Sequence, residues 1–432
     1  MEHGRDKFRK LDGGRSVASA DNPEPFVGDP HQQGLNQMGD DGNVSEGRRN
    51  RSLYFSLRRR DLSASQTSSP LYKVGVADPD SPPAPSPARE TLHRTCNLET
   101  DMGGKTFVFL PHSGWIVGVG GDPGATIIFD TKTDRVIRGP ELVSKKWRPV
   151  VAVVGGSKIY ALAATPDYLE DPDFPPWFEV LDLSGDPAVT EAADGTLRLD
   201  EAACSWKALP CPACFPDRLC PMEFRGAPFI TVRSSAVVGR YILVSLNQPS
   251  YCVFAFDTVS GKWHKIAGEY LSFVGAATLR EHGGDIFLAF SHKDGPIKAY
   301  RICVSAATSR QPSDEEGCGN NIELSITAIT VRDKEHFEAG LGGGCCLISL
   351  DREHFSVLFW YEGRGRYLVY DKETEETYPR KLYLKLVTYR TESPVLEGKT
   401  PEIVISSQRE QTFKVCSSLG FDSAPIAFAL SI

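Results

Sequence analysis

Short apolar runs separated by turn residues dominate the chain from residue 105 to its end. Residues 251–266 read YCVFAFDTVSGKWHKI: a β-branched and aromatic run, an Asp-Thr pair, a Ser-Gly turn and a second run opened by Trp263. This order is typical of a β-hairpin. No segment keeps an apolar period of 3.6 residues, so we expect an all-β chain.

The hairpin pattern recurs along the chain. Residues 127–140 read IIFDTKTDRVIRGP, residues 367–379 read YLVYDKETEETYP, and a looser copy, FEVLDL, spans residues 178–183. The expected strands fall into groups of four, spaced roughly 40 to 50 residues apart, which is the period of a β-propeller blade. We predict a single kelch-like β-propeller over residues 52–432, with six blades favoured and seven as the alternative.

The two ends of this region are expected to meet in one blade. An early strand at residues 53–57 has no hairpin neighbour, and we predict that it pairs with the last strand, residues 424–432, because this closure leaves no open sheet edge. A second short strand at residues 71–76 precedes a Pro/Ser-rich tether at residues 78–91. The fifth group is expected at 345–350, 354–360, 366–370 and 376–378, and the remaining strands at 383–387, 402–405, 412–415 and 426–430.

The N-terminal segment differs in composition. Residues 1–51 contain few bulky apolar side chains and are predicted to be a disordered tail. Arginines at positions 48, 49, 51 and 58–60 flank the first strand. They could form a nuclear localisation signal, but the favoured interpretation is that they keep a strand at a domain edge soluble.

Composition and charge narrow the class of protein. The net charge of −8 gives no support to nucleic-acid binding, and no run of eighteen apolar residues exists that would span a membrane. The first residues lack the apolar core of a secretory signal, and eleven cysteines is an odd count. We therefore expect reduced thiols, a cytoplasmic or nuclear location, and a monomer that binds a protein partner.

Several motifs resemble known repeats. Glycine pairs at residues 120–121, 155–156 and 283–284, and a Trp six residues after Asp257, resemble degenerate kelch repeats. SLYFSLRR at 52–59, FDT at 129–131 and SWKALPCPACF at 205–215 resemble a large plant family, expanded in grasses, of kelch-like proteins catalogued as a domain of unknown function. This resemblance covers residues 52–432 and implies a propeller but no activity. Some relatives carry an F-box and serve as ubiquitin-ligase receptors, whereas residues 1–51 lack the apolar helical pattern of an F-box.

Two clusters of polar residues could carry chemistry. Cys204, Cys211, Cys214 and Cys220 contain only one C-x-x-C pair among several prolines, so a stiff proline-rich connection is favoured over a zinc site. DKEH, from Asp333 to His336, is echoed by DREH, from Asp351 to His354. These could hold a metal or an acid–base pair, but equivalent polar turns at strand starts are favoured. The sequence predicts no catalytic, cofactor-binding or metal-binding residue.

The favoured function is a non-enzymatic protein–protein interaction module that recognises a substrate or serves as a scaffold. The alternatives are a ubiquitin-ligase adaptor without an F-box and an enzyme that uses the propeller's central funnel. Connections 165–176 and 210–228 far exceed a hairpin turn, and aromatic, Met and Arg side chains often anchor interfaces. We predict protein binding by Tyr168, Phe174, Trp177, Phe215, Arg218, Met222, Phe224 and Arg225. Alternatively, the aromatic side chains pack these connections against the ring.

Overall fold

The structure is a computed structural model, and its described residues form β-strands and no helix. It describes residues 51–59, 66–81, 92–101, 104–165, 176–212, 215, 230–247, 252–267, 269–280, 284–291, 297–306, 322–332, 344–362, 368–370, 377–392, 402–416 and 421–432. Asn50–Ile432 forms one compact unit. The expected disordered tail, up to residue 50, lies outside the described residues.

Most strands belong to antiparallel groups of four. Groups 1 to 5 are numbered in chain order, and group 6 combines the last strand with the first three. Group 1 contains β4 (Lys105–Leu110), β5 (Trp115–Gly120), β6 (Ile127–Asp130) and β7 (Arg135–Arg138). Group 2 contains β8 (Val150–Val154), β9 (Lys158–Leu162), β10 (Phe178–Asp182) and β13 (Trp206–Ala208). Group 3 contains β14 (Val232–Val238), β15 (Tyr241–Leu246), β16 (Cys252–Asp257) and β17 (Lys262–Ala267).

The second half of the chain adds three more groups. Group 4 contains β18 (Val274–Leu279), β19 (Ile286–Phe290), β20 (Ile297–Ala306) and β21 (Ile322–Arg332). Group 5 contains β22 (Gly344–Ser349), β23 (His354–Glu362), β26 (Lys381–Thr391) and β27 (Glu402–Cys416). Group 6 contains β28 (Phe421–Ser431), β1 (Ser52–Arg59), β2 (Gln66–Gly75) and β3 (His93–Asp101).

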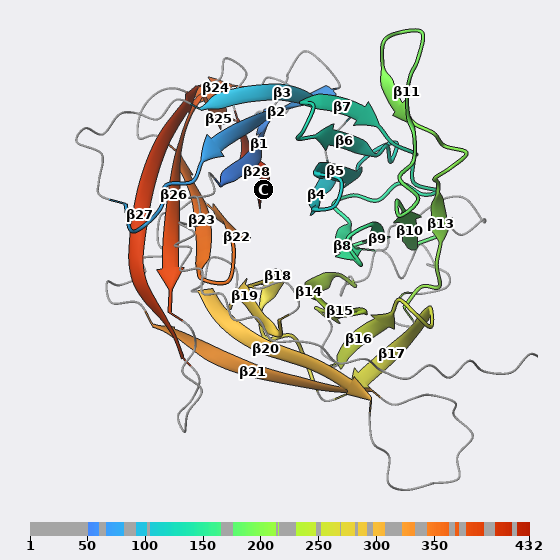
Figure 1. The fold of residues 1–432 in the computed structure, drawn as a ribbon, viewed down its shortest axis with the longest axis vertical. Coiled ribbons are helices and arrows are strands. Elements are labelled where there is room, and N and C mark those ends of the chain that lie inside the picture. The colour runs from blue at the N-terminus through green and yellow to red at the C-terminus, as the bar shows by residue number, and fades with distance from the viewer. Residues whose placement is uncertain are drawn as a thin grey trace, which may run out of the picture. The chain divides into compact units, whose positions relative to one another are not determined.

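Each group lies beside the groups before and after it (Figure 1), and apolar side chains pack between them. Separate clusters of buried side chains lie between groups 1 and 2, 2 and 3, 3 and 4, 4 and 5, 5 and 6, and 6 and 1. The first strands follow the same order, because β4 contacts β8, β8 contacts β14, β14 contacts β18, β18 contacts β22, β22 contacts β28 and β28 contacts β4. The succession therefore returns to its start, although no hydrogen-bonded sheet of the described residues closes on itself.

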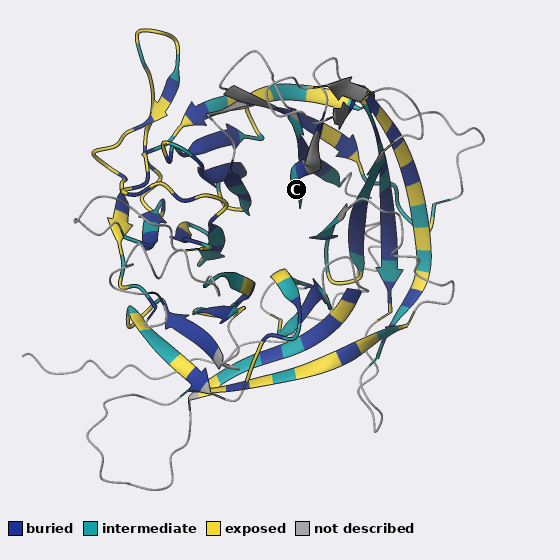
Figure 2. Cartoon of the chain, turned by 180° about the vertical axis from the view of Figure 1, so that it is seen from behind, coloured by how far each residue is buried: buried dark blue, intermediate teal, exposed yellow. Residues whose placement is uncertain are grey.

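The fourth strand of a group is more exposed than the second strand in groups 1 to 5. Figure 2 shows exposed residues along β21 and β27, the fourth strands of groups 4 and 5. By contrast, all six residues of β5 are buried. Two short parallel ladders, β14 with β18 and β21 with β27, connect groups 3 to 5 into one sheet of twelve strands.

The repeated Asp-Thr pair has two structural roles in its hairpins. The Asp257 carboxylate accepts the N–H of Val259 at 3.0 Å, and Gly261 completes the turn with a positive φ of 69°. Thr258 Oγ1 donates to the carbonyl of Arg240, in the turn of the preceding hairpin, at 2.8 Å. Asp130 and Thr131 repeat these contacts in group 1. The hairpin predicted at residues 251–266 is thus present as β16 and β17.

Group 6 is built from both ends of Asn50–Ile432. β1 lies between β28 and β2 and pairs antiparallel with both, so the early strand and the last strand meet as the sequence predicted. Leu53, Phe55 and Leu57 are buried against group 5, while Tyr54 on the other face is buried against group 1. The sequence did not predict β3, which completes the group.

Group 5 corrects the strand assignment made from the sequence. Its third and fourth strands are β26 and β27, while β24 (Leu368–Tyr370) and β25 (Thr377–Pro379), which look like the repeated hairpin, form a separate two-stranded sheet. The expected strands at 402–405 and 412–415 are one strand, β27. The polar run SSQREQ between them reads as a break in the sequence. It is tolerated because β27 is half exposed and alternates buried with exposed residues.

The sequence also did not predict the strands in the insertion between β10 and β13. The insertion forms β11 (Val189–Glu191) and β12 (Leu197–Leu199), and β12 pairs in parallel with β7 of the preceding group. Leu197 and Leu199 fill the cluster between groups 1 and 2. In the described part of the chain, no helix has the length and apolar character needed to cross a membrane.

Candidate functional site

An extended segment in the β7–β8 connection exposes every second side chain. Pro140, Leu142, Ser144 and Lys146 are buried, whereas Glu141, Val143, Lys145 and Trp147 are exposed. This alternation gives the segment one anchored face and one solvent face, as in a half-buried strand. We call residues 141–148 the ridge.

Backbone contacts hold the ridge against group 1. The N–H of Leu142 donates to the carbonyl of Gly124 at 3.1 Å, and the N–H of Gly121 donates to the carbonyl of Lys146 at 2.9 Å. Both glycines lie in the β5–β6 connection and have positive φ values, 108° for Gly124 and 81° for Gly121, so their backbone favours glycine. The ridge therefore lies directly on the β5–β6 connection.

A buried ion pair joins the anchored face of the ridge to group 2. The side chains of Lys146 and Glu179, from β10, are 0% exposed and in direct contact. The Glu179 carboxylate also accepts the N–H groups of Val143 at 2.7 Å and Ser144 at 3.1 Å. Lys146 Nζ donates to the carbonyl of Pro176 at 2.8 Å and to Ser144 Oγ at 2.9 Å. Burial lowers the pKa of the Lys146 amine, against the attraction of Glu179, which acts to raise it.

The solvent face of the ridge contains two of the large apolar side chains that the described structure leaves exposed. Val143 is 62% exposed and Trp147 is 57% exposed. The Trp147 ring lies over the backbone of Gly104, where a Cβ atom would collide with it. Lys145 pairs with Asp122 at 2.9 Å, and Arg148 is exposed beside the Trp.

The ridge lies at the same end of groups 1 and 2 as the elaborated connections. Ser144 Oγ and Lys146 Nζ both bond the carbonyl of Pro176, at the end of the β9–β10 connection. The start of that connection meets the end of the β13–β14 connection, because Val232 N donates to Ala164 O at 2.8 Å. We call this end of the two groups the loop end.

The residues predicted to bind a protein are only partly described. Trp177 and Phe215 are buried in the cluster between groups 2 and 3, which for these two side chains favours the alternative that they pack the connections against the core. Tyr168, Phe174, Arg218, Met222, Phe224 and Arg225 lie outside the described residues. Sequence reasoning missed the ridge, although a Trp between cations in an eleven-residue connection, 139–149, is a readable signal.

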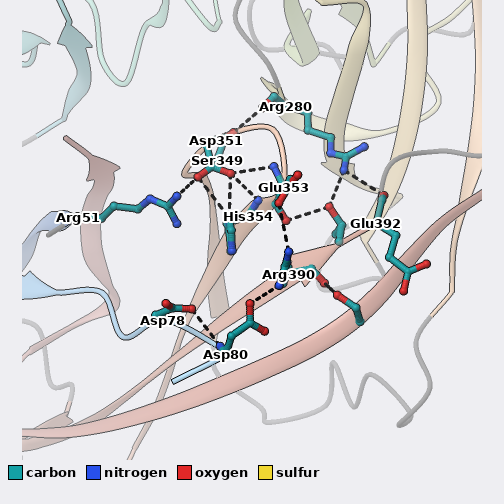
Figure 3. Close-up of polar contacts among 12 residues, drawn as sticks. Arg51, Asp78, Asp80, Arg280, Ser349, Asp351, Glu353, His354, Arg390 and Glu392 are labelled. Atoms are coloured by element: carbon teal, nitrogen blue, oxygen red, sulfur yellow. Dashed lines mark hydrogen bonds and ion pairs between the residues drawn. The ribbon is translucent and has the colours of Figure 1, made fainter. Parts of the chain in front are cut away.

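The Asp351–His354 motif forms a polar interlock between groups 5 and 6 (Figure 3). The Asp351 carboxylate accepts the N–H groups of Glu353 and His354 at 2.8 Å each, and His354 Nδ1 lies 2.9 Å from it. Arg51, just before β1, forms an ion pair with the same carboxylate. The contacts are those of the polar turn that the sequence favoured, with an added link to the N-terminal strand. Its copy from Asp333 to His336 lies outside the described residues.

The interlock extends through the carboxyl end of β26. Arg390 forms ion pairs with Asp80, which follows β2, and with Glu353. Ser407 of β27 donates to Asp80 at 2.9 Å, and the N–H of Thr391 donates to the carbonyl of Glu353 at 2.7 Å. Arg280, which follows β18, donates to Thr391 Oγ1 at 2.5 Å and so adds group 4. Every member has a partner, so the interlock is built to join strand groups.

Acid should weaken this interlock. Burial acts to raise the pKa of Asp351, but hydrogen bonds from His354 and Glu353 and the charges of His354 and Arg51 outweigh it and hold the pKa at about 2. A carboxyl group with a lowered pKa in the folded state stabilises the fold above its unfolded pKa of about 3.9, and this contribution is lost as pH falls through the folded value. Asp351→Asn should therefore flatten the fall in unfolding free energy between about pH 4 and pH 2.

Urea unfolding at intervals through this pH window is the measurement. Asp351 is about one-third exposed, so solvent screening should limit the loss at pH 7 to about 1 kcal/mol. Asp122→Asn, which changes a more exposed carboxylate, is the control. An identical pH dependence in wild type and Asp351→Asn would contradict the prediction.

Two cysteines of the considered zinc site are described. Cys204 is buried and its thiol lies 3.4 Å from the carbonyl of Asp200, while Cys211 is half-buried. Cys214 and Cys220 lie outside the described residues. Among the described residues, no group of three or more His, Cys, Asp or Glu side chains is arranged to hold a metal ion.

A family model described as "Protein of unknown function (DUF1668)" matches residues 44–413. The chain belongs to the DUF1668 family. The match covers groups 1 to 5 almost completely and includes β1, β2 and β3 of group 6. No curated protein matches this DUF1668 chain.

Solved structures show distant similarity. A proposed 6-phosphogluconolactonase from Bacteroides uniformis is 11% identical with a TM-score of 0.37, covering 89% of this chain and 99% of that one. Another from Bacteroides fragilis is 8% identical with a TM-score of 0.39, covering 91% and 100%. YjhT is 12% identical with a TM-score of 0.32, covering 82% and 97%.

Proposed function

We propose that the chain is a six-bladed, kelch-like β-propeller that serves as a non-enzymatic protein-interaction module. Six strand groups that pack in a closed succession, with group 6 containing both early and late strands, support this architecture. The Asp-Thr turns and the glycine pairs with positive φ at Gly120-Gly121 and Gly155-Gly156 support the relation to kelch repeats.

The observation that carries the proposed function is a rigid, exposed ridge beside the described ends of the β9–β10 and β13–β14 connections at the loop end. A scaffold of packed sheets can hold such connections in place, and binding residues commonly lie on loops held in this way. Val143 and Trp147 add exposed apolar surface at this end. The partner is therefore a protein that docks at the loop end of groups 1 and 2.

Site-specific photo-crosslinking tests the proposed function. A photoreactive phenylalanine analogue replaces Lys145 on the ridge, and in a control protein it replaces Val259, which is 74% exposed in the β16–β17 turn. In extract from the source cells, the analogue at position 145 should capture a discrete protein and the analogue at 259 should not. Capture from position 259 alone, or from neither position, would contradict a partner at the loop end.

A further inference from the structure

The ridge has the features of a preorganised binding surface. Its anchored face is fixed by the Lys146–Glu179 pair and by the contacts with the β5–β6 connection. Arg148 has a positive φ of 46°, a conformation that non-glycine residues rarely adopt, and its N–H donates to the carbonyl of Gly104 at 2.7 Å. Surrounding contacts thus set the direction in which Trp147 and Arg148 leave the backbone. A surface fixed in advance loses little conformational entropy when a partner binds.

The charge around Trp147 is opposite to that of the chain. The net charge of the protein is −8, but three of the four residues 145–148 are cationic. Glu179 neutralises Lys146, and Asp122 pairs with Lys145. No ion pair joins Arg148 to another residue in the described part of the chain, and its side chain is exposed. An uncompensated guanidinium therefore lies next to a largely exposed indole.

We infer that Trp147 and Arg148 bind an acidic segment of the partner protein that also presents an apolar side chain. This inference rests on the proposed function and specifies the partner that it requires. A guanidinium binds a carboxylate through two parallel hydrogen bonds, and the indole face buries a large apolar area. Trp and Arg are also the residues that most often dominate the binding energy of interfaces. Val143 is exposed on the same face of the ridge as Trp147, four positions earlier, and adds apolar surface for the partner's side chain.

A protein segment fits this surface better than two other anionic partners. A nucleic acid requires a clustered basic excess, whereas the ridge also exposes Glu141 and has Asp122 beside Lys145. Each basic residue near an anionic membrane contributes about 1 kcal/mol of binding free energy, so the two exposed cations Lys145 and Arg148 would give only a weak attraction. A protein segment with one apolar side chain and one carboxylate, in contrast, can contact Trp147 with the first and Arg148 with the second.

Peptide selection on the full chain tests the inference. A displayed library of random twelve-residue peptides is the probe, and enriched peptides are synthesised and titrated by fluorescence anisotropy. Trp147→Ala and Arg148→Glu are the test variants, and Lys298→Glu, an exposed lysine on β20, is the matched charge-reversal control. Circular dichroism and thermal melting of each variant establish that the fold is retained.

We expect enriched peptides with Asp or Glu beside an apolar residue. Their affinity should fall about 30-fold in Trp147→Ala and in Arg148→Glu, as for a central anchor, and should be unchanged in Lys298→Glu. A second selection on Arg148→Glu should enrich Lys or Arg in place of the acidic residue, which a purely structural role of Arg148 would not produce.

Other outcomes would overturn the inference. One is enrichment of peptides without acidic residues, and another is wild-type affinity of the selected peptides for both ridge variants. A third is ridge-dependent binding of phosphatidylserine vesicles or a single-stranded oligonucleotide in place of peptides. The inference can fail while the proposed function holds. If the partner captured from position 145 still binds Arg148→Glu at full affinity, the loop end binds a protein but not through this pair.

Discussion

Removal of residues 1–60 should unfold the protein or lower its melting temperature sharply, while removal of residues 1–46 should leave stability nearly unchanged. β1 occupies an interior position in group 6, between β28 and β2, so its loss removes a central strand and exposes two sheet edges. Leu53, Phe55 and Leu57 are each 0% exposed and fill the cluster against group 5. Arg51 and its ion pair with Asp351 are lost as well.

Thermal unfolding of the two truncated proteins measures the effect. The longer deletion should lower the melting temperature by about 10 °C or more, since several kcal/mol of packing disappear from a chain of this size. Phe55→Ala in the full chain isolates the packing contribution: its ring stacks on Tyr72 with centroids 5.4 Å apart, and its loss should cost about 3–5 kcal/mol. Equal stability of the two truncated proteins would contradict closure by β1.

Single substitutions in the Lys146–Glu179 pair should destabilise the protein by about 3–5 kcal/mol, because each leaves the other charge buried without its partner. Glu179→Gln keeps an oxygen that can accept the N–H of Val143 or Ser144 but leaves the ammonium of Lys146 unpaired. Lys146→Met leaves the carboxylate with only those two N–H groups.

The double variant Lys146→Met with Glu179→Gln provides the control. Because it removes both charges, it should lose less free energy of unfolding than the sum of the single variants, with a coupling of about 1–3 kcal/mol. Urea unfolding at pH 7 measures all four proteins. If the unfolding free energies of the single variants lay within about 1 kcal/mol of wild type, the pair would not be what holds the ridge in place.

Local patterns allowed the hairpins to be predicted from the sequence. Asp130 and Asp257 fold their own turns through N–H groups two residues away, so the information lies within a few positions. The first four groups were predicted because their strands are consecutive, apart from the inserted hairpin that follows β10. The pairing of β1 with β28 was also predicted correctly, but the premise that the early strand has no hairpin neighbour was wrong, because β2 pairs antiparallel with β1.

Group 5 shows where local patterns mislead. The segment from β24 to β25 carries the repeated motif but lies outside the group, whereas β27 has a polar centre and lies inside it. Pairing with β26 along most of β27, from Lys381↔Cys416 to Thr391↔Ile405, decides its place. Such pairing depends on the partner strand and not on the apolar pattern of the strand itself.

The sequence by itself determined the four principal strands of each of groups 1 to 4, the hairpins among them and the all-β class, because turn chemistry and alternation act between neighbouring residues. Only the tertiary structure decided which residues face solvent at the loop end. It buried Trp177 and Phe215, left Trp147 exposed, and paired Lys146 with Glu179 across 33 positions of sequence. These outcomes depend on how two strand groups pack against each other, and no local pattern of hydrophobic and polar residues encodes that contact.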